Sequence, residues 1–286
     1  MKIRSFAKVN LGLQIEGLLP DGYHKIKTIF QSIDLFDIIE IELINSGIVI
    51  EGDRQDIPWD EDNFIYKAVD KFKKRFGIRK GVRIYVEKRI PPGSGLGGGS
   101  SNAGCTLIAL RKIFFNDLKV EELVPIASEI SADTSYFLHG GTCIGEGKGD
   151  IIKEIEDIEN LYFFLVIPDI KVSSKEAYNE WDRAGLTFST KNFNIEELGT
   201  YIKLEYLRND LEEVVLRKYE ELGKIKEKMM KEGFKKVLMS GSGSCIYGIV
   251  ENINDAIKSK ENFTPYRVEI VKSIGRKEYW ERLFID

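Results

Sequence analysis

Residues 89–104 read RIPPGSGLGGGSSNAG, a composition suited to binding phosphate groups. Six glycines and three serines stand within these sixteen residues. Glycine lacks a Cβ, so a phosphate can approach the backbone N–H groups closely. The N-terminus of a following helix adds unpaired N–H groups and a partial positive charge. The stretch therefore predicts a cradle for the phosphates of a nucleotide.

Three other interpretations of this stretch fit less well. A flexible linker would not lie between two regularly patterned elements, and Pro91 and Pro92 stiffen its start. A Walker A loop needs a Lys-Ser or Lys-Thr pair after its last glycine, whereas Ser100 and Ser101 follow Gly99. A dinucleotide fingerprint needs an acidic residue at the end of a second strand, about 20 residues further on, and none stands there.

The elements beside the loop must position it. Apolar residues alternate over 82–86, which predicts a strand, and recur at helical spacing over 103–114, which predicts a helix. The order is therefore strand, glycine loop, helix. A further strand at 39–43 and a helix over 63–76 predict a β-rich layer with a helix packed against it.

The N-terminal stretch 3–15 predicts another strand. Apolar or small residues occupy every second position on one face, and Phe6 is the exception on the other. Side chains two residues apart in a strand point to the same side. Lys8 and Asn10 are therefore expected to project together from the polar face.

The second half of the chain predicts a separate β-α-β-β-α-β unit, the plan of ferredoxin-like domains. We thus expect an α+β protein with two domains, residues 1–155 and 156–286. A second small-residue loop, MSGSGSC at 239–245, connects two strands of this unit, and such a loop is often only the connection of an ordinary β-hairpin. The expected elements are strands at 161–167, 237–239, 245–250 and 267–271, with helices within 174–231 and near 256.

Composition excludes several classes of protein. The 286 residues carry a net charge of −4 without a basic stripe, which argues against a nucleic-acid partner. No apolar run approaches the roughly 20 residues of a membrane span, so we expect a cytoplasmic protein with no membrane partner. Three separated cysteines are expected as free core thiols, and two histidines are too few for a His-rich metal site. We expect a monomer or a weak homodimer.

Four segments together resemble one family. PPGSGLGGGSSNAG, at 91–104, resembles the phosphate-binding signature of the GHMP small-molecule kinases, and LMSGSGSCIYG, at 238–248, resembles their C-terminal glycine motif. AKVNLGL, at 7–13, and DGYH, at 21–24, resemble a narrower branch, which acts on 4-diphosphocytidyl-2-C-methyl-D-erythritol. The similarity runs from Lys8 to about Gly248.

The resemblance implies a fold and a reaction. The fold would combine an N-terminal domain like ribosomal protein S5 domain 2, which carries ATP, with a C-terminal ferredoxin-like domain, and the substrate would bind between them. The enzyme would transfer the γ-phosphoryl group of ATP to the 2-hydroxyl of this cytidine-linked substrate, in non-mevalonate isoprenoid biosynthesis. Mg²⁺ is expected from ATP chemistry, and no cluster of metal ligands is visible in the sequence.

The resemblance also implies site residues. Asp133 matches the catalytic aspartate of the family and Lys8 its lysine partner, and an ammonium beside a carboxylate favours the charged form of both. Asn10, Tyr23, His24 and Tyr178 match substrate-binding positions, the two tyrosines on opposite faces of the cytosine ring and His24 at its hydrogen-bonding edge. The expected ATP-binding residues are Pro91, Pro92, Gly93, Ser94, Gly95, Leu96, Gly97, Gly98, Gly99, Ser100 and Ser101, with Asn63 and Lys88 near the adenine.

The sequence departs from the family after Asp133. A small apolar residue, Pro and Phe usually follow the aspartate, whereas Thr134, Ser135 and Tyr136 follow it here. The loss of proline frees one backbone angle, and a neighbouring hydroxyl could compete for the carboxylate of Asp133. Two other functions fit the sequence less well: a GHMP kinase for homoserine or mevalonate, which has no use for a Tyr-His pair, and a non-catalytic nucleotide- or RNA-binding protein, which would not need Lys8 and Asp133.

Overall fold

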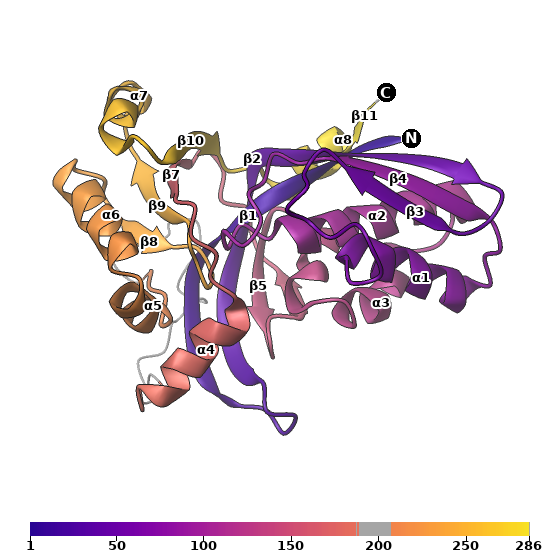
Figure 1. Cartoon of the computed structure of the whole chain (residues 1–286), viewed down its shortest axis with the longest axis horizontal. Helices are drawn as coiled ribbons and strands as arrows, with labels where there is room; N and C mark the ends of the chain where they lie inside the picture. The colour runs from indigo at the N-terminus through magenta and orange to yellow at the C-terminus, as the bar shows by residue number, and fades with distance from the viewer. Residues whose placement is uncertain (187, 189–206, 286) are drawn as a thin grey trace.

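Two β-sheets organise this computed structural model, which describes residues 1–186, 188 and 207–285 (Figure 1). The first sheet has seven strands and the second has four. The first comprises β1 (Lys2–Leu18), β2 (His24–Ile44), β3 (Ile48–Gly52), β4 (Gly81–Glu87), β5 (Thr142–Glu146), β6 (Ile151–Glu154) and β11 (Phe284–Ile285). Its order is β11-β1-β2-β4-β3, with β5 paired to both β2 and β6. All these pairings are antiparallel except β3 with β4.

Helices α1 (Phe64–Phe76), α2 (Gly98–Phe114) and α3 (Val124–Ser128) lie together beside the first sheet in Figure 1. Residue types set the limits of α1, because the side chain of Asn63 caps its first turn and Gly77 ends it in the left-handed conformation. The apolar face of α1 is buried, and α2 is buried over most of its first three turns. The predicted order of strand, glycine loop and helix is confirmed by β4 and α2.

The second sheet has the order β10-β7-β9-β8. Numbered within this unit, the order is 4-1-3-2, and every pair is antiparallel, as expected of a ferredoxin-like β-α-β-β-α-β unit. Its strands are β7 (Tyr162–Ile167), β8 (Val237–Met239), β9 (Ile246–Val250) and β10 (Arg267–Lys272), and its helices are α4 (Ser174–Arg183), α5 (Glu212–Lys218), α6 (Glu220–Lys231) and α7 (Ile253–Ser259). Part of the predicted helical region 174–231 lies outside the described residues.

The last elements return to the first sheet. Helix α8 (Arg276–Leu283) buries Tyr279 and Leu283 in the core beneath that sheet, and β11 pairs with β1. A division into 1–155 and 156–286 therefore separates α8 and β11 from the sheet against which they pack. The domain boundary near residue 155 stays a prediction.

Strands β1 and β2 run through both halves of the molecule (Figure 1). The prediction of a short strand at 39–43 was too narrow, because those residues are only the end of the 21-residue β2. A register shift between Phe6 and Ala7 interrupts the alternation of β1, which accounts for Phe6 as an exception to the pattern. The polar face of β1 is covered, so Lys8 and Asn10 are buried at 2% and 3% exposure.

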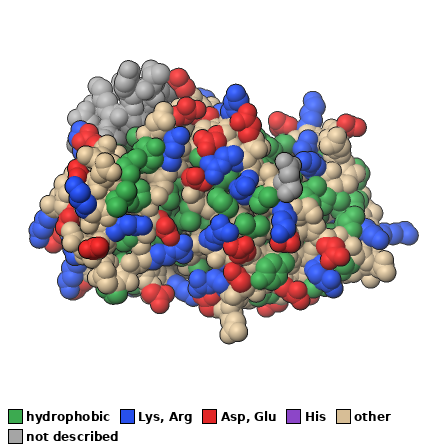
Figure 2. All heavy atoms as spheres, turned by 90° about the horizontal axis from the view of Figure 1, so that it is seen from above, with side chains coloured by type: hydrophobic (Ala, Val, Ile, Leu, Met, Phe, Trp, Pro, Cys, Tyr) green, Lys and Arg blue, Asp and Glu red, His purple; other side chains and the backbone are tan. Residues whose placement is uncertain are grey.

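The surface mixes charges of both signs. On the face drawn in Figure 2, basic and acidic side chains alternate with small apolar areas. None of the helices in residues 1–186 and 207–285 is long and apolar enough to span a bilayer. Cys105, Cys143 and Cys245 are free and buried, as predicted.

Candidate active site

The glycine loop between β4 and α2 depends on backbone angles that glycine adopts easily. Gly93, Gly95 and Gly97 have φ angles of 70°, 76° and 72°, in the left-handed region. Gly97 is also the residue immediately before α2. The loop thus ends at the N-terminus of a 17-residue helix, where N–H groups are free to bind an anion.

The second small-residue loop, 240–244, packs directly on the first. The hydroxyl of Ser240 donates to the carbonyl oxygen of Gly95 at 3.0 Å, and the N–H of Cys245 donates to that of Ser94 at 3.0 Å. A Cβ at Gly95 would lie 2.1 Å from the carbonyl oxygen of Ser240. The contact therefore requires glycine at this position.

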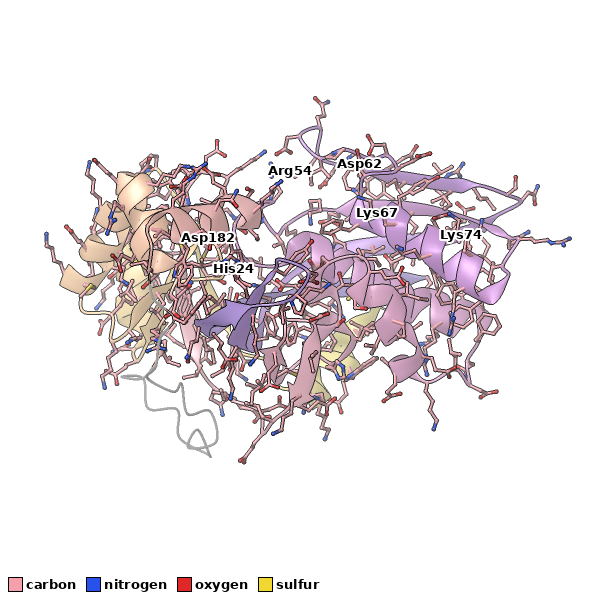
Figure 3. All side chains as sticks on the ribbon, turned by 90° about the horizontal axis from the view of Figure 1, so that it is seen from below. His24, Arg54, Asp62, Lys67, Lys74 and Asp182 are labelled. Atoms are coloured by element: carbon pink, nitrogen blue, oxygen red, sulfur yellow. The ribbon has the colours of Figure 1, made fainter. Side chains whose placement is uncertain are left out.

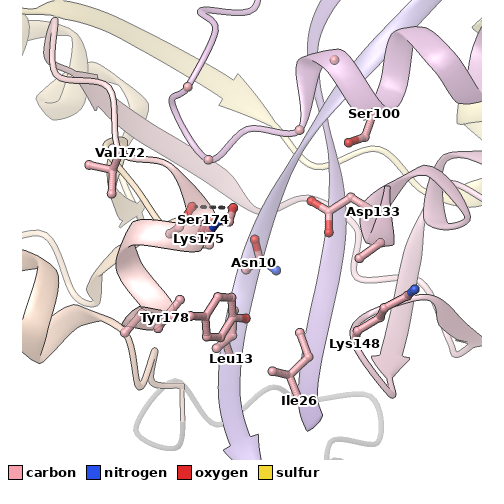
Figure 4. A pocket seen from close by; sticks show the side chains of 18 of the residues that line it. Asn10, Leu13, Ile26, Ser100, Asp133, Lys148, Val172, Ser174, Lys175 and Tyr178 are labelled. Carbon is pink, nitrogen blue, oxygen red and sulfur yellow. Dashed lines mark hydrogen bonds between the residues drawn. The ribbon is translucent and has the colours of Figure 1, made fainter. Parts of the chain in front are cut away.

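A cavity of about 770 Å³ lies between the two domains, with the glycine loop in its wall. In Figure 4, Asn10 and Asp133 lie between Ser100, at the start of α2, and Tyr178, on α4. The cavity wall includes Lys8, Asn10, Tyr23, His24, Asp133, Tyr178 and, from the predicted ATP-binding set, Pro91, Pro92, Gly93, Ser94, Gly95, Gly97, Gly98, Gly99 and Ser100.

Lys8 and Asp133 meet at the middle of this cavity. The ammonium of Lys8 lies 3.3 Å from a carboxylate oxygen of Asp133, and it also donates to the side-chain oxygen of Asn10. The amide nitrogen of Asn10 donates to the hydroxyl of Thr28 at 2.8 Å, which fixes its orientation. Lys8 is buried, whereas the side chain of Asp133 is 32% exposed. A buried cation thus holds a carboxylate that a ligand can still reach.

The residues after Asp133 do not compete for its carboxylate. The hydroxyl of Thr134 lies 2.7 Å from that of Ser131, so the predicted competition is wrong for this residue. Tyr136 donates to the carbonyl oxygen of Gly141 at 2.8 Å and stacks on Phe30. Thr134 and Tyr136, which depart from the family motif, therefore have partners of their own and leave the carboxylate of Asp133 free of them.

The far end of the cavity is aromatic. Tyr23 is 60% exposed on the turn between β1 and β2, and Tyr178 projects from α4. His24 stacks on Tyr178, with ring centroids 4.8 Å apart and planes inclined by 19°. One face of Tyr178 is thus already covered, so a base could stack only on the other. His24, predicted as an edge contact alone, also supports this ring.

Two predicted ATP-binding side chains point away from the cavity. Ser101 is fully buried, and its hydroxyl donates to the carbonyl oxygen of Phe6 at 2.6 Å. Leu96 is also fully buried, and its carbonyl oxygen accepts from the backbone N–H of Lys8 at 3.0 Å. Their location corrects the expectation that all of 91–101 faces a nucleotide, because the loop turns Leu96 into the core and the first turn of α2 turns Ser101 into it.

The two residues expected near adenine also lie outside the cavity wall. Asn63 caps α1 by accepting from the N–H of Ile65 at 2.9 Å. Lys88 forms a buried ion pair with Asp37 and donates to Asn102 at 2.9 Å. A buried carboxylate needs such a partner, so the structure assigns Lys88 to the support of the glycine loop.

No sequence motif indicated that several further residues line the cavity. Lys148 lies on the turn between β5 and β6, with its ammonium 5.3 Å from the ring centroid of Tyr23. Ser174 and Lys175 begin α4, and Ser174 lies within 3.1 Å of the hydroxyl of Ser242. A lysine in a glycine-flanked turn resembles any surface lysine in sequence. Only the fold brings these residues to the cavity.

Comparison with known proteins identifies the family. Residues 63–141 match the N-terminal domain of GHMP kinases and residues 189–264 their C-terminal domain. The chain is 38% identical to the 4-diphosphocytidyl-2-C-methyl-D-erythritol kinase of Thermoanaerobacter pseudethanolicus, over 92% of this chain and 91% of the relative. The chain belongs to the 4-diphosphocytidyl-2-C-methyl-D-erythritol kinase family. A member from Clostridium botulinum strain Kyoto is 40% identical over 88% of this chain and 92% of its own.

Solved structures agree with this assignment. A crystal structure of a kinase of the same family superposes with a TM-score of 0.78 at 29% identity, covering 96% of this chain and all of the other. A homoserine kinase from Cytophaga hutchinsonii gives a TM-score of 0.73 at 19% identity, covering 96% and 95%, which shows the fold alone. The predicted GHMP kinase fold and the predicted kinase family are both confirmed.

Proposed function

We propose that this protein uses ATP to phosphorylate the 2-hydroxyl of 4-diphosphocytidyl-2-C-methyl-D-erythritol, in non-mevalonate isoprenoid precursor biosynthesis. One observation carries the proposal beside the family assignment. A single cavity joins the glycine loop to an aromatic end, and the pair of Lys8 and Asp133 lies between them. A donor of phosphoryl groups and a nucleoside-linked acceptor would meet at this pair.

In the proposed reaction, Asp133 accepts the proton of the 2-hydroxyl. The oxygen then attacks the γ-phosphorus, and the bond from that phosphorus to the bridging oxygen of ADP breaks. Phosphoryl transfer depends mainly on positioning and on stabilising the charge of the transferred group. Lys8 orients the carboxylate of Asp133, and its ammonium offsets charge on the transferring oxygens.

Backbone N–H groups of the glycine loop and of the first turn of α2 would hold the phosphates of ATP. The described residues contain no group of three or more His, Cys, Asp or Glu arranged to hold a metal ion. Mg²⁺ commonly takes one or two carboxylates together with phosphates and water. Asp133 and the Ser100 hydroxyl, both in the cavity wall, would hold such an ion, and its positive charge would neutralise part of the charge of the phosphates.

The test is ATP consumption by the purified protein with four acceptors: 4-diphosphocytidyl-2-C-methyl-D-erythritol, methylerythritol phosphate, mevalonate and homoserine. We expect turnover with the cytidine compound alone. Homoserine kinases share the fold, so this comparison separates branches of the superfamily. Turnover on mevalonate or homoserine, or on none of the four, would refute the proposed substrate.

A further inference from the structure

The side chain of Lys8 lies between the two small-residue loops. A Cβ at Gly97, in the first loop, would lie 3.0 Å from Cε of Lys8. A Cβ at Gly241, in the second loop, would lie 3.3 Å from the ammonium of Lys8 and 3.0 Å from the side-chain oxygen of Asn10. The two loops therefore form a slot around the lysine, with Gly97 on one side and Gly241 on the other. The width of this slot limits where the ammonium can lie relative to Asp133.

The amide of Asn209 holds the backbone of the second loop. Its nitrogen donates to the carbonyl oxygen of Met239 at 2.9 Å and to that of Gly241 at 2.7 Å. Its oxygen accepts from the N–H of Leu211 at 3.0 Å. Asn209 is 6% exposed and does not belong to the cavity wall. An amide offers two N–H donors, so both are used on the loop.

The backbone around Asn209 is in turn bonded to β1. The N–H of Leu13 donates to the carbonyl oxygen of Arg208 at 2.8 Å, and the N–H of Asp210 donates to that of Leu13 at 2.9 Å. Lys8 lies on the same strand. Asn209 therefore links the second loop to the strand that carries the lysine, although these segments are far apart in the sequence.

We propose that Asn209 is a positioning residue for phosphoryl transfer: it fixes the Gly241 side of the slot and so keeps the ammonium of Lys8 beside Asp133. The inference rests on the proposed function, in which Asp133 accepts the proton and Lys8 offsets charge. A displacement of about 1 Å in a reacting group can lower a rate about 100-fold. A residue outside the cavity wall can therefore control kcat.

The aromatic end of the cavity is held by other contacts. Nε2 of His24 lies 2.8 Å from a carboxylate oxygen of Asp182, on α4, and Figure 3 shows these two side chains close together. His24 also stacks on Tyr178. Loss of the Asn209 bonds should therefore change kcat more than the KM for the cytidine substrate.

Two variants separate the donors of Asn209 from its shape. Asn209→Asp keeps the shape and the acceptor for Leu211, but it offers at most one donor in place of two, and none when ionised. Asn209→Ala removes all three bonds. Ser273→Ala is the control, because the hydroxyl of Ser273 also bonds to the backbone, accepting from the N–H of Leu161 at 3.1 Å, and Ser273 is buried outside the cavity wall.

The first experiment is amide hydrogen exchange, read by mass spectrometry on peptides that span 240–245, which needs no substrate. The N–H groups of Ser240, Gly243 and Cys245 are all hydrogen-bonded in this loop. We expect them to exchange about tenfold faster in both Asn209 variants, the equivalent of one lost hydrogen bond, and at the wild-type rate in Ser273→Ala. Unchanged exchange in both Asn209 variants would overturn the inference.

The second experiment measures kcat and KM with the cytidine substrate, at a temperature where each variant is folded. We expect kcat to fall about 10- to 100-fold in both Asn209 variants, with KM little changed and both constants of Ser273→Ala as in the wild type. A wild-type kcat in Asn209→Asp, or a rise in KM alone, would overturn the inference.

A third variant tests the slot from the loop side if the Asn209 variants do not fold. Gly241→Ala should also lower kcat, because its Cβ would crowd Lys8 and Asn10. A wild-type kcat in Gly241→Ala would overturn the inference. Failure of the wild type to use the cytidine substrate would instead count against the proposed function, and hydrogen exchange would still test whether Asn209 holds the loop.

Discussion

The ammonium of Lys8 and the carboxylate of Asp133 lie 3.3 Å apart, brought together from β1 and from the short 3-10 helix Ala132–Thr134. Asp133→Asn keeps the shape of the side chain and removes the proton acceptor. We expect kcat to fall by about 10²–10⁴ with little change in the thermal unfolding midpoint, because the side chain is partly exposed. Steady-state ATP consumption and a melting curve test this. Near-normal turnover would show that Asp133 is not the base.

Gly95→Ala should damage the phosphate cradle. The new Cβ would lie 2.1 Å from the carbonyl oxygen of Ser240, at a residue with a φ of 76°. We expect weaker ATP binding and a loss of about 1–3 kcal/mol in the free energy of unfolding. Gly17→Ala is the matched control, since no atom of the described part of the chain lies within 4 Å of the added Cβ there. Urea unfolding and ATP titration of both variants measure the difference, and equal behaviour would contradict the packing argument.

Tyr178→Ala should weaken substrate binding more than catalysis. Stacking of a base on an aromatic ring contributes about 1–3 kcal/mol. We expect KM for the cytidine substrate to rise roughly 5- to 150-fold, with kcat nearly unchanged because Lys8 and Asp133 lie elsewhere in the cavity. The structure records no hydrogen bond of the Tyr178 hydroxyl to a described residue, so Tyr178→Phe should behave as wild type. A large effect of the phenylalanine variant would point to a role for the hydroxyl.

Two hydroxyls near Asp133 should differ in their effect on stability. Tyr136 bonds to Gly141 and lies 2.6 Å from the hydroxyl of Ser32, whereas the buried hydroxyl of Ser135 has no partner among the described residues. Removing a bonded hydroxyl leaves its partner unpaired, so Tyr136→Phe should lower the free energy of unfolding by about 1–3 kcal/mol. Ser135→Ala should be neutral or stabilising. Urea unfolding of both variants measures these free energies of unfolding. A larger loss in Ser135→Ala than in Tyr136→Phe would refute the argument.

Alkaline pH should destabilise the fold through its buried thiols. Burial raises the pKa of Cys105 to about 11 and that of Cys143 to about 12, from an ordinary value of 9.0. Above about pH 9 the unfolded chain releases these protons while the folded chain keeps them. Stability present below that pH is therefore lost as pH rises toward 11–12, by up to about 1.4 kcal/mol per thiol and pH unit.

The measurement is the urea midpoint at about pH 8 and about pH 10. Cys105→Ala removes one titrating thiol, so its midpoint should fall less between the two values, although its midpoint at the lower pH is also reduced by the cavity left behind. An equal fall in both proteins would show that Cys105 does not contribute.

Sequence patterns predicted the elements with a single buried face. The alternation at 82–86 and the helical spacing at 103–114 correspond to β4 and α2. The same patterns missed the middle of the 21-residue β2 and the short β5, which are buried on both faces. They also missed β6, whose four mostly exposed residues are too few to show a period. Period-two reasoning cannot detect a strand that lacks a solvent face.

The candidate site shows the same division. Motif resemblance selected Lys8 and Asp133, which the fold brings into contact. Local sequence gave no indication that Lys88 turns inward to Asp37, or that Asp182 contacts His24, because both partners come from distant segments. Side-chain direction in loops depends on tertiary contacts, so it was the least predictable part of the site.

The return of α8 and β11 to the first sheet bears on how the protein is made. Tyr279 bonds to the carbonyl oxygen of Phe137, and Ile285 pairs with Lys2 on the edge of β1. A chain emerging from the ribosome cannot complete the sheet that carries Lys8 until residues 276–285 have been synthesised. The first sheet and its core therefore gain their last packing partners, α8 and β11, only after the four-stranded sheet has been synthesised.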